Sequence, residues 1–213
     1  MKAVIIGASG LIGTSLVRQL ADDDGFSNIV TLGRRPAFEG IDKVANHLVD
    51  FDHLDDAAAL ISGDVMFSAL GTTKKQAGSL DAQRRIDVDY QLRAAQIAAK
   101  NGVGHYVLVS SSGADSQSGN AYLQMKGALE DSIASLPFHK ITILQPSLLT
   151  GPRREKRTGE KIAQIVMPIF TALPAWRKYR PIHCDVVARK MIQACHEQDQ
   201  PRKTYRLDEI FAR

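Results

Sequence analysis

KAVIIGASGLIG, at residues 2–13, is a short apolar run followed at once by three glycines that are spaced three residues apart. An amphipathic stretch continues from Leu11 to about Ala21, and a second apolar run covers residues 29–32, directly before a Gly-Arg-Arg triplet at residues 33–35. A buried strand, a tight turn, a helix and a second strand in this order make up a βαβ unit. The amino-terminal part of the chain therefore predicts the layout of a dinucleotide-binding unit.

Each of the three glycines has a different task in such a turn. Gly7 lets the chain leave the strand, Gly10 leaves room for a pyrophosphate against the backbone, and Gly13 lets the helix pack close to the sheet. The helix amino terminus adds free N–H groups and the positive end of its dipole. The spacing is GxxGxxG rather than GxGxxG, and a tight turn with a purely structural purpose is the alternative. The candidate cofactor contacts of this turn are Gly7, Ser9, Gly10, Leu11, Ile12 and Gly13.

The end of the second predicted strand selects between the two nicotinamide dinucleotides. Enzymes that use NAD usually place a carboxylate there, about 20 residues after the glycine turn, to bind the ribose 2′-hydroxyl. This chain has Gly33, Arg34 and Arg35 instead. Guanidinium groups form charge-assisted, bidentate bonds with a phosphate, so Arg34 and Arg35 favour NADP(H) as the cofactor. A solvated basic pair in a loop is the alternative.

Length and composition are those of one globular domain. The chain has 213 residues, of which 44% are hydrophobic and 23% are charged, and its formal net charge is +4. A chain of this size can bury a sizeable core. No apolar run approaches the roughly 18 residues of a membrane span, and the first apolar run leads into the glycine turn rather than into a cleavage site. We therefore expect a cytoplasmic protein that has no membrane partner.

Charged clusters and cysteines exclude little else. A dense basic cluster occupies residues 153–157, with Lys161 nearby. Nucleic-acid binding through this cluster is the weakest functional alternative, because a solvated loop beside an anionic cofactor or substrate explains the same charges. Cys184 and Cys195 are predicted to share one helix at a separation of about 16 Å, which is too far for a disulfide. Cysteines and histidines show no metal-ligand spacing, so we expect no metal.

Strand and helix patterns alternate along the whole chain. Predicted strands cover residues 2–6, 29–32, 47–51, 65–70, 106–110, 140–144 and 204–207, and predicted helices cover residues 11–21, 52–61, 80–101, 121–136 and 184–197. This alternation predicts an α/β fold, a doubly wound parallel sheet (Rossmann fold) with helices on both faces. We expect residues 1–213 to form a single domain. Residues 151–182 break the rhythm and are predicted to be a small carboxy-terminal insertion on the substrate side.

A candidate catalytic trio follows the strand predicted at residues 106–110. Ligands of doubly wound sheets bind at the carboxyl ends of strands, and Ser111 lies at such an end. Tyr122 and Lys126 are four residues apart in the next predicted helix, so they share a helix face. A nearby ammonium stabilises a phenolate, and Tyr122 could then exchange a proton with a carbonyl or an alcohol. An ordinary pair on an amphipathic helix is the alternative for Tyr122 and Lys126.

Several longer motifs resemble one known family. They are GASGLIG at residues 7–13, LGRR at 32–35, VDFDHLDD at 49–56, ALGTTKKQAGS at 69–79, SSSGAD at 110–115 and YLQMKG at 122–127. Through them the chain resembles an atypical short-chain dehydrogenase/reductase, in particular the NADP-binding Tat-interacting oxidoreductase-like group. The resemblance spans most of residues 2–150.

The resemblance implies further site residues. It implies a Rossmann sheet, an adenine pocket near Asp50 and Phe51, and catalytic residues Ser111, Tyr122 and Lys126. The serine assignment leaves Ser110 and Ser112 open, because the three serines are consecutive. Asp87 stands where many relatives have an Asn that helps a proton relay. The remaining candidate cofactor contacts are Leu70, Gly71 and Thr72 in one loop, Tyr122 and Lys126, and Pro146 after the strand predicted at residues 140–144.

Two classes of function follow from these residues. The first is an NADP(H)-dependent oxidoreductase that acts on a carbonyl or alcohol group of a small molecule, with Tyr122 as proton donor. The alternative is an NADP(H)-sensing regulatory protein with little or no turnover, because the fold alone does not settle activity. The trio favours the enzyme, since a sensor has no need of the phenol. No motif identifies the substrate or the oligomeric state.

Overall fold

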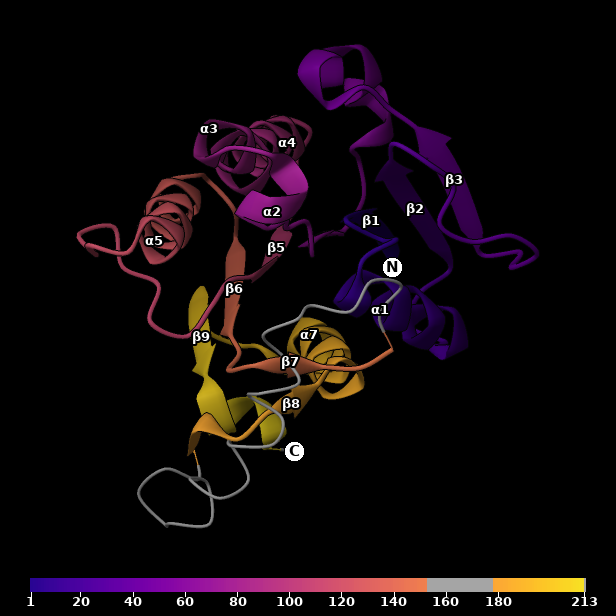
Figure 1. Cartoon of the computed structure of the whole chain (residues 1–213). Coiled ribbons are helices and arrows are strands. Elements are labelled where there is room, and N and C mark those ends of the chain that lie inside the picture. The colour runs from indigo at the N-terminus through magenta and orange to yellow at the C-terminus, as the bar shows by residue number, and fades with distance from the viewer. Residues whose placement is uncertain (153–177, 213) are drawn as a thin grey trace.

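The computed structural model describes residues 1–152 and 178–212 of the chain. Its centre is a seven-stranded sheet with the strand order β3-β2-β1-β4-β5-β6-β9 (Figure 1). All six neighbouring pairs in this sheet are parallel, which confirms the predicted doubly wound sheet. The strands are β1 (Lys2–Ile6), β2 (Asn28–Gly33), β3 (Val44–Leu48), β4 (Val65–Ser68), β5 (His105–Val109), β6 (Lys140–Gln145) and β9 (Arg202–Arg206).

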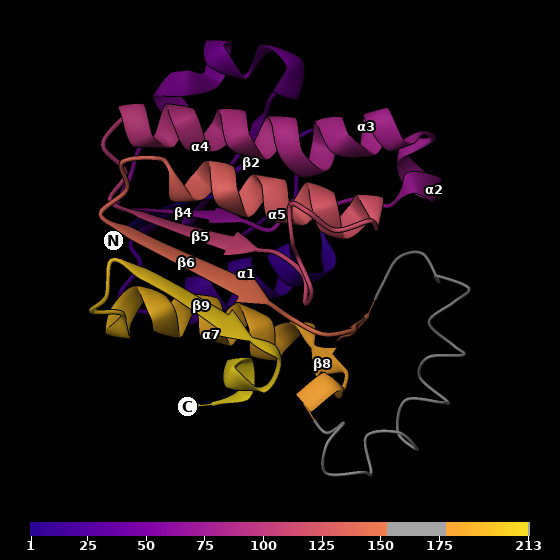
Figure 2. The ribbon, with the colours of Figure 1, turned by 90° about the vertical axis from the view of Figure 1, so that its left-hand side faces the viewer.

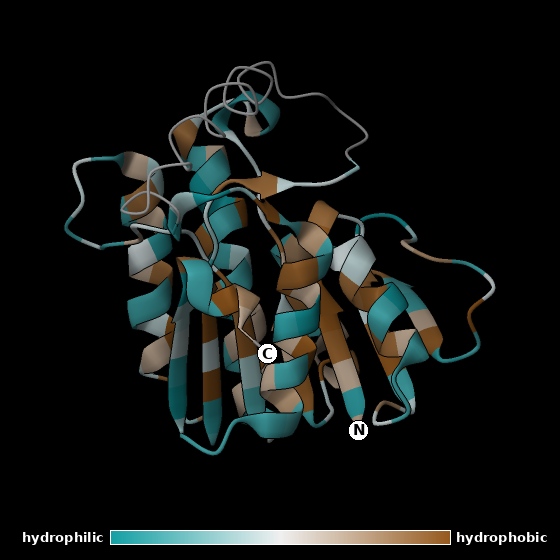
Figure 3. Cartoon of the chain, turned by 90° about the horizontal axis from the view of Figure 1, so that it is seen from below, coloured by the Kyte–Doolittle hydropathy of each residue, from teal (hydrophilic) through white to brown (hydrophobic). Residues whose placement is uncertain are grey.

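Helices cover both faces of the sheet. The helices α4 (Tyr90–Lys100) and α5 (Ala121–Ala134) lie on one face, and α1 (Leu11–Asp22) and α7 (Cys184–Glu197) lie on the other (Figure 2). In Figure 3 the helices carry both hydrophilic and hydrophobic residues, whereas the central strands are largely hydrophobic.

Successive side chains of a strand point to opposite faces of the sheet, so β1 supplies two separate cores. Val4 and Ile6 belong to the core under α4 and α5, whereas Ala3 and Ile5 belong to the core over α1 and α7. All four are fully buried, which explains why this strand reads as a continuous apolar run rather than an alternating one.

The two edge strands are displaced from their predicted positions. The third strand, expected at residues 47–51, is β3 at Val44–Leu48. It is an edge strand whose residues are half-buried or exposed, so it lacks the apolar run that marks the buried strands. The expected strand at residues 204–207 is β9 at Arg202–Arg206, the other edge. Edge strands face solvent and carry polar residues, which explains both errors.

The long helix expected at residues 80–101 is interrupted. It consists of α3 (Leu80–Arg84), a π-helical segment η2 (Arg85–Asp89), and α4. The sequence pattern did not predict the π-helical segment, and such segments are frequent at functional sites. The expected helix at residues 52–61 is the 3₁₀ segment η1 (Phe51–Leu60), in which His53 has non-helical backbone angles.

Short elements that were not predicted complete the fold. They are α2 (Lys74–Ala77), η4 (Leu207–Phe211), β7 (Leu149–Thr150) and β8 (Ile182–His183). β7 and β8 pair in parallel, with Leu149 opposite Ile182, so the two ends of the predicted insertion at 151–182 lie side by side. The basic cluster at 153–157 and Lys161 fall outside the described residues.

Candidate cofactor pocket and active site

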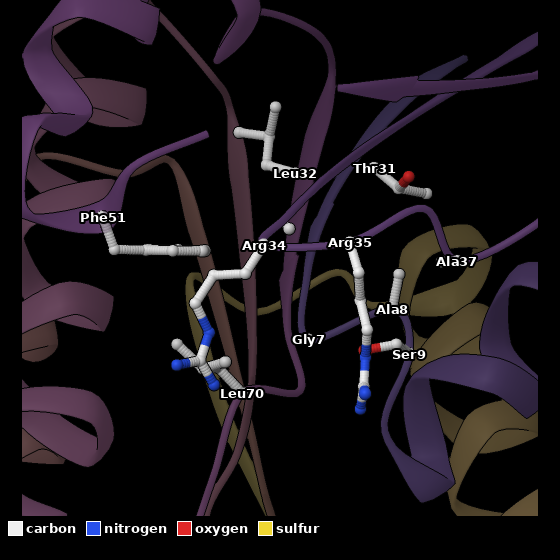
Figure 4. Close-up of a pocket in the computed structure, with 11 residues that line it drawn as sticks. Gly7, Ala8, Ser9, Thr31, Leu32, Arg34, Arg35, Ala37, Phe51 and Leu70 are labelled. Atoms are coloured by element: carbon white, nitrogen blue, oxygen red, sulfur yellow. The ribbon is translucent and has the colours of Figure 1, made fainter. Parts of the chain in front are cut away.

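The candidate cofactor pocket opens at the carboxyl ends of β1 and β2. The chain runs outward from β1 to β3, then crosses to β4 and continues to β9, so the neighbouring strands β1 and β4 mark the topological switch point where such sheets bind ligands. The lining residues come from the glycine turn, the β2 end, and the starts of η1 and the loop after β4 (Figure 4). They are Gly7, Ala8, Ser9, Thr31, Leu32, Gly33, Arg34, Arg35, Ala37, Phe51 and Leu70.

The glycine turn has the geometry that the sequence predicts. Gly7 has a φ of +82°, and a Cβ on it would lie 2.4 Å from the carbonyl carbon of Ala69. A Cβ on Gly13 would lie 2.1 Å from the Gly7 oxygen, because α1 packs directly against the turn. Gly10 is the N-cap of α1 and has no side chain with which to cap the helix. The helix amino terminus therefore keeps its N–H groups for an anion.

Arg34 and Arg35 follow the end of β2 and line the pocket, with Arg34 extending toward Leu70 and Arg35 toward Ser9 (Figure 4). Both are exposed, and within residues 1–152 and 178–212 neither guanidinium forms a salt bridge. The Asn46 side chain fixes the chain that follows them, because its Oδ1 accepts hydrogen bonds from Thr31 Oγ1 at 2.8 Å and from the Ala37 backbone N–H at 3.2 Å. The sequence patterns did not predict a role for Asn46. A single amide side chain in a strand region was the only indication of one.

Asp50 and Phe51 have different positions relative to the pocket. Phe51 lines it and is buried, with 7% of its surface exposed. The Asp50 carboxylate caps η1 instead: it accepts the backbone N–H of Asp52 at 2.9 Å and lies 3.0 Å from Nδ1 of His53. The His53 hydrogen bond, followed by that backbone bond, lowers the pKa of Asp50, and the same carboxylate raises the pKa of His53. Asp50 is not among the pocket-lining residues.

The loop after β4 is held by buried polar side chains of the interrupted helix. The Asp87 carboxylate, which is fully buried, accepts the Thr72 backbone N–H at 2.7 Å. Gln83 donates to the Thr72 carbonyl at 3.4 Å and to Asp87 at 3.2 Å. Gln91 donates to the Asp87 carbonyl at 2.8 Å and accepts from Ser68 Oγ at 2.6 Å. Leu70, in the same loop, lines the pocket. The buried side chains of Gln83, Asp87 and Gln91 therefore support one wall of the pocket.

Gln83 and Gln91 were not predicted as supporting residues. Gln83, Asp87 and Gln91 are spaced four residues apart, which places them on one helix face, but the sequence does not show that this face is buried. The π-helical segment between α3 and α4 contains Asp87.

The candidate catalytic residues lie around the end of β5. Lys126 is 4% exposed, and its Nζ donates to the Val109 carbonyl at 3.5 Å. Tyr122 lies one turn earlier on α5 and is 38% exposed. The structure thus brings Lys126 to the strand end and leaves the Tyr122 ring accessible. Asn120 caps this helix by accepting the Tyr122 backbone N–H at 3.0 Å.

The three consecutive serines differ in burial. Ser110 is 5% exposed, and its hydroxyl has no hydrogen-bond partner among the described residues. Ser111 is half-buried, with only a weak 3.4 Å contact to the Ser112 carbonyl. Ser112 is half-buried as well, so only Ser110 is set apart by burial. The Ser112 N–H donates to the Pro146 carbonyl at 3.0 Å, so the loops after β5 and β6 are joined.

One group of possible metal ligands was not expected. Ligand atoms of His183, Cys184 and Asp185 lie within 4.8 Å of one another at the start of α7. Internal bonds occupy them, because Ser15 Oγ donates to Asp185 at 2.5 Å and His183 Nδ1 accepts the Asp185 N–H at 3.4 Å. Burial and the adjacent Asp185 raise the pKa of the Cys184 thiol. The group therefore caps α7 and contacts α1.

A doubly wound sheet with a glycine turn, a free helix amino terminus and two arginines at one pocket defines a dinucleotide-binding protein. The comparisons with known proteins agree. A family model described as NAD(P)H-binding matches residues 7–166, so the chain belongs to this NAD(P)H-binding family. It is an atypical short-chain dehydrogenase/reductase of the HTATIP2 type.

Curated relatives cover most of the chain. It is 36% identical to Protein HTATIP2 of Rattus norvegicus over 193 residues, which are 88% of this chain and 78% of that protein. It is 35% identical to the mitochondrial protein fmp52 of Emericella nidulans over 76% of this chain and 73% of that protein. Since fungal relatives are named mitochondrial, a cytoplasmic location stays a prediction. Within the described residues, no helix is long and apolar enough to span a bilayer.

Solved structures share the fold at low sequence identity. A short-chain dehydrogenase/reductase superfamily protein from Agrobacterium tumefaciens with bound NAD has a TM-score of 0.73 and 12% identity, over 97% of this chain and 77% of that one. MoeE5 in complex with UDP-glucuronic acid and NAD has a TM-score of 0.72 and 17% identity, over 97% of this chain and 76% of that one. These similarities support the Rossmann fold.

Proposed function

We propose that the protein is an NADP(H)-dependent oxidoreductase that acts on a carbonyl or alcohol group of a small molecule. The observation that carries the proposal is the position of Lys126, buried with its Nζ at the end of β5 and four residues from the accessible Tyr122. A buried cation at a strand end where such sheets bind ligands, one helical turn from an accessible phenol, suits proton transfer.

The preference for NADP(H) rests on the end of β2. Arg34 and Arg35 line the pocket, and the described part of the lining contains no carboxylate that would repel a 2′-phosphate. The glycine turn and the α1 amino terminus would hold the pyrophosphate, and Phe51 and Leu70 offer apolar surface. The residues present therefore fit NADP(H).

Each residue of the trio has a distinct task in this proposal. When bound, the cofactor supplies or accepts the hydride. Tyr122 donates a proton to the substrate oxygen in the direction of reduction, and Lys126 stabilises the phenolate that remains. Ser111 donates a hydrogen bond to the substrate oxygen and fixes its orientation.

The test is NADPH oxidation against a broad panel of aldehydes and ketones, with NADPH affinity measured separately by calorimetry. We expect turnover with at least one carbonyl class and its loss in Tyr122→Phe. Tight NADPH binding without turnover across the panel would contradict the enzyme and favour the sensing alternative. Absence of NADPH binding would contradict both.

A further inference from the structure

Among the residues that the structure describes, Phe51 is the only aromatic residue that lines the cofactor pocket. The other lining residues include the glycine turn, which suits phosphates, and the two arginines, which suit a 2′-phosphate. A flat apolar ring in such a pocket offers a stacking surface for a base. The base of the cofactor that belongs with a 2′-phosphate is adenine, and the Phe51 ring offers it an aromatic surface beside the apolar Leu70.

A second aromatic ring supports Phe51 from the helix layer. The rings of Phe51 and Tyr90 are 5.4 Å apart between centroids and inclined by 32°. Tyr90 is the first residue of α4, directly after the π-helical segment, and it packs against the same core as Phe51. Tyr90 is not among the pocket-lining residues. Its contact with the pocket is therefore indirect, through Phe51.

Polar contacts fix Tyr90 to the segment that carries Phe51. The Tyr90 hydroxyl donates to Asp52 Oδ1 at 2.5 Å. Arg85 Nη2 lies 2.6 Å from the same oxygen, and its guanidinium is 5.8 Å from the centre of the Tyr90 ring. Burial and the Asp52 carboxylate raise the pKa of Tyr90, so its hydroxyl stays protonated and remains a donor. The residue next to Phe51 in the chain is thus held by two side chains.

We propose that Tyr90, fixed by Asp52 and Arg85, is the positioning residue that holds the Phe51 ring as the stacking wall for the adenine base of the cofactor. The inference rests on the cofactor assignment of the proposed function. It also gives the π-helical segment a second role. The segment presents Asp87 to the Thr72 loop and Arg85 to Asp52, so one helical turn supports two walls of the pocket.

The test separates the two halves of the cofactor. Affinities for 2′,5′-ADP, which contains the adenine half, and for reduced nicotinamide mononucleotide are measured by calorimetry. Tyr90→Ala removes the supporting ring, and we expect it to weaken 2′,5′-ADP about threefold to tenfold, the scale of one aromatic pair. Binding of reduced nicotinamide mononucleotide should not change. Tyr90→Phe keeps the ring and loses only the hydroxyl, so its effect should be smaller.

The chain offers a matched control for this comparison. Arg93 of α4 forms an ion pair with Asp55 of η1, including a 3.0 Å bond from its Nε. This pair joins the same two segments, but neither residue lines the pocket. Arg93→Gln should leave both affinities unchanged. If Tyr90→Ala lowers the melting temperature but leaves 2′,5′-ADP affinity at the wild-type value, Tyr90 is only structural.

Two other outcomes overturn the inference. Equal weakening of both probes in Tyr90→Ala would mean general loosening of the pocket rather than support of the base wall. Should Tyr90→Ala not fold, unchanged 2′,5′-ADP affinity in both Tyr90→Phe and Asp52→Asn would overturn it as well. Wild-type protein that binds 2′,5′-ADP but turns over no carbonyl contradicts the proposed activity alone and leaves the role of Tyr90 standing.

Discussion

The buried Asp87 carboxylate accepts the backbone N–H of Thr72 at 2.7 Å, across 15 residues of chain. Gln83 donates to the carbonyl of the same Thr72 residue at 3.4 Å. The N–H and the carbonyl of Thr72 are therefore both held by side chains of the interrupted helix, in the way that a neighbouring strand would hold them. This contact fixes the loop that carries Leu70 into the cofactor pocket.

Removal of the Asp87 carboxylate should loosen this loop. Asp87→Ala leaves the Thr72 N–H without its acceptor and should lower the free energy of unfolding by about 1–3 kcal/mol. Asp87→Asn keeps an acceptor oxygen and should lose less. Urea unfolding measures the free energy of unfolding. Calorimetry with NADPH shows whether the loosened loop weakens cofactor binding. Equal stability of the Ala and Asn variants would show that the hydrogen bond to Thr72 contributes nothing.

Substitution of Gly10 should weaken cofactor binding but should not prevent folding. A Cβ at Gly10 would meet the Gly7 oxygen at 3.2 Å, which small shifts can relieve. It would stand where the pyrophosphate approaches, so Gly10→Val should fold and lose NADPH affinity by at least about tenfold, or 1.4 kcal/mol. Gly13→Val is the contrast, since its Cβ would lie 2.1 Å from backbone and should prevent folding. Wild-type affinity in a folded Gly10→Val protein would reject the site.

Arg34 and Arg35 should determine the choice of cofactor. Replacement of both by Ala removes charge-assisted bonds that contribute about 1.5–3 kcal/mol each. NADPH affinity should fall and NADH affinity should hardly change, as measured by calorimetry with both cofactors. An equal loss for the two cofactors would mean that the arginines do not bind the 2′-phosphate. Tighter binding of NADH than of NADPH by the wild type would overturn the preference.

Turnover should depend on the Tyr122 hydroxyl. Tyr122→Phe keeps the ring and should lower kcat by about 100-fold or more, the scale of a general acid, with little change in NADPH affinity. Lys126→Ala should lower both kcat and NADPH affinity, because its buried ammonium lies at the carboxyl end of β5, where sheets of this kind bind their ligands. Steady-state kinetics and calorimetry separate the two effects. Turnover that survives in Tyr122→Phe would remove Tyr122 from the mechanism.

His105 should make the fold sensitive to acid. Burial, with a smaller contribution from Lys140, lowers the pKa of His105 to about 4, whereas a histidine in an unfolded chain titrates near 6.5. Between these values the unfolded chain binds a proton that the folded protein does not. Stability is therefore lost as the pH falls from about 6.5 to 4, by at most about 1.4 kcal/mol per pH unit from this group.

The measurement compares urea unfolding of wild type and His105→Gln between pH 7.5 and pH 4.5. Wild type and variant must be compared because His53, whose pKa is raised, stabilises the folded protein as the pH falls, which is the opposite of the effect of His105. Wild type should lose stability relative to the variant as the solution becomes acidic. Parallel stability curves would mean that His105 is not kept neutral by the fold.

Local sequence patterns were enough for the sheet and the phosphate turn. Gly13 is required by a contact with the Gly7 oxygen six residues earlier, Gly7 has a positive φ in the turn, and buried strands such as β1 have a continuous apolar signature. The supports of the pocket could not be found in this way. Asn46, Gln83 and Tyr90 act through residues that are distant in the chain, such as Thr31, Thr72 and Asp52. Their roles depend on tertiary contacts that no short motif encodes.

The parallel pair β7 and β8 has a consequence for how new specificities can arise on this frame. Leu149 and Ile182 are paired neighbours, although 33 positions separate them in the chain. A stretch whose two ends meet at one place can change in length or composition without altering the register of the surrounding strands, and closing a longer loop costs little additional free energy. We therefore expect that exchanging the residues between this pair of strands for the corresponding stretch of a relative leaves the nucleotide half of the sheet unchanged, because β7 and β8 hold the two ends together.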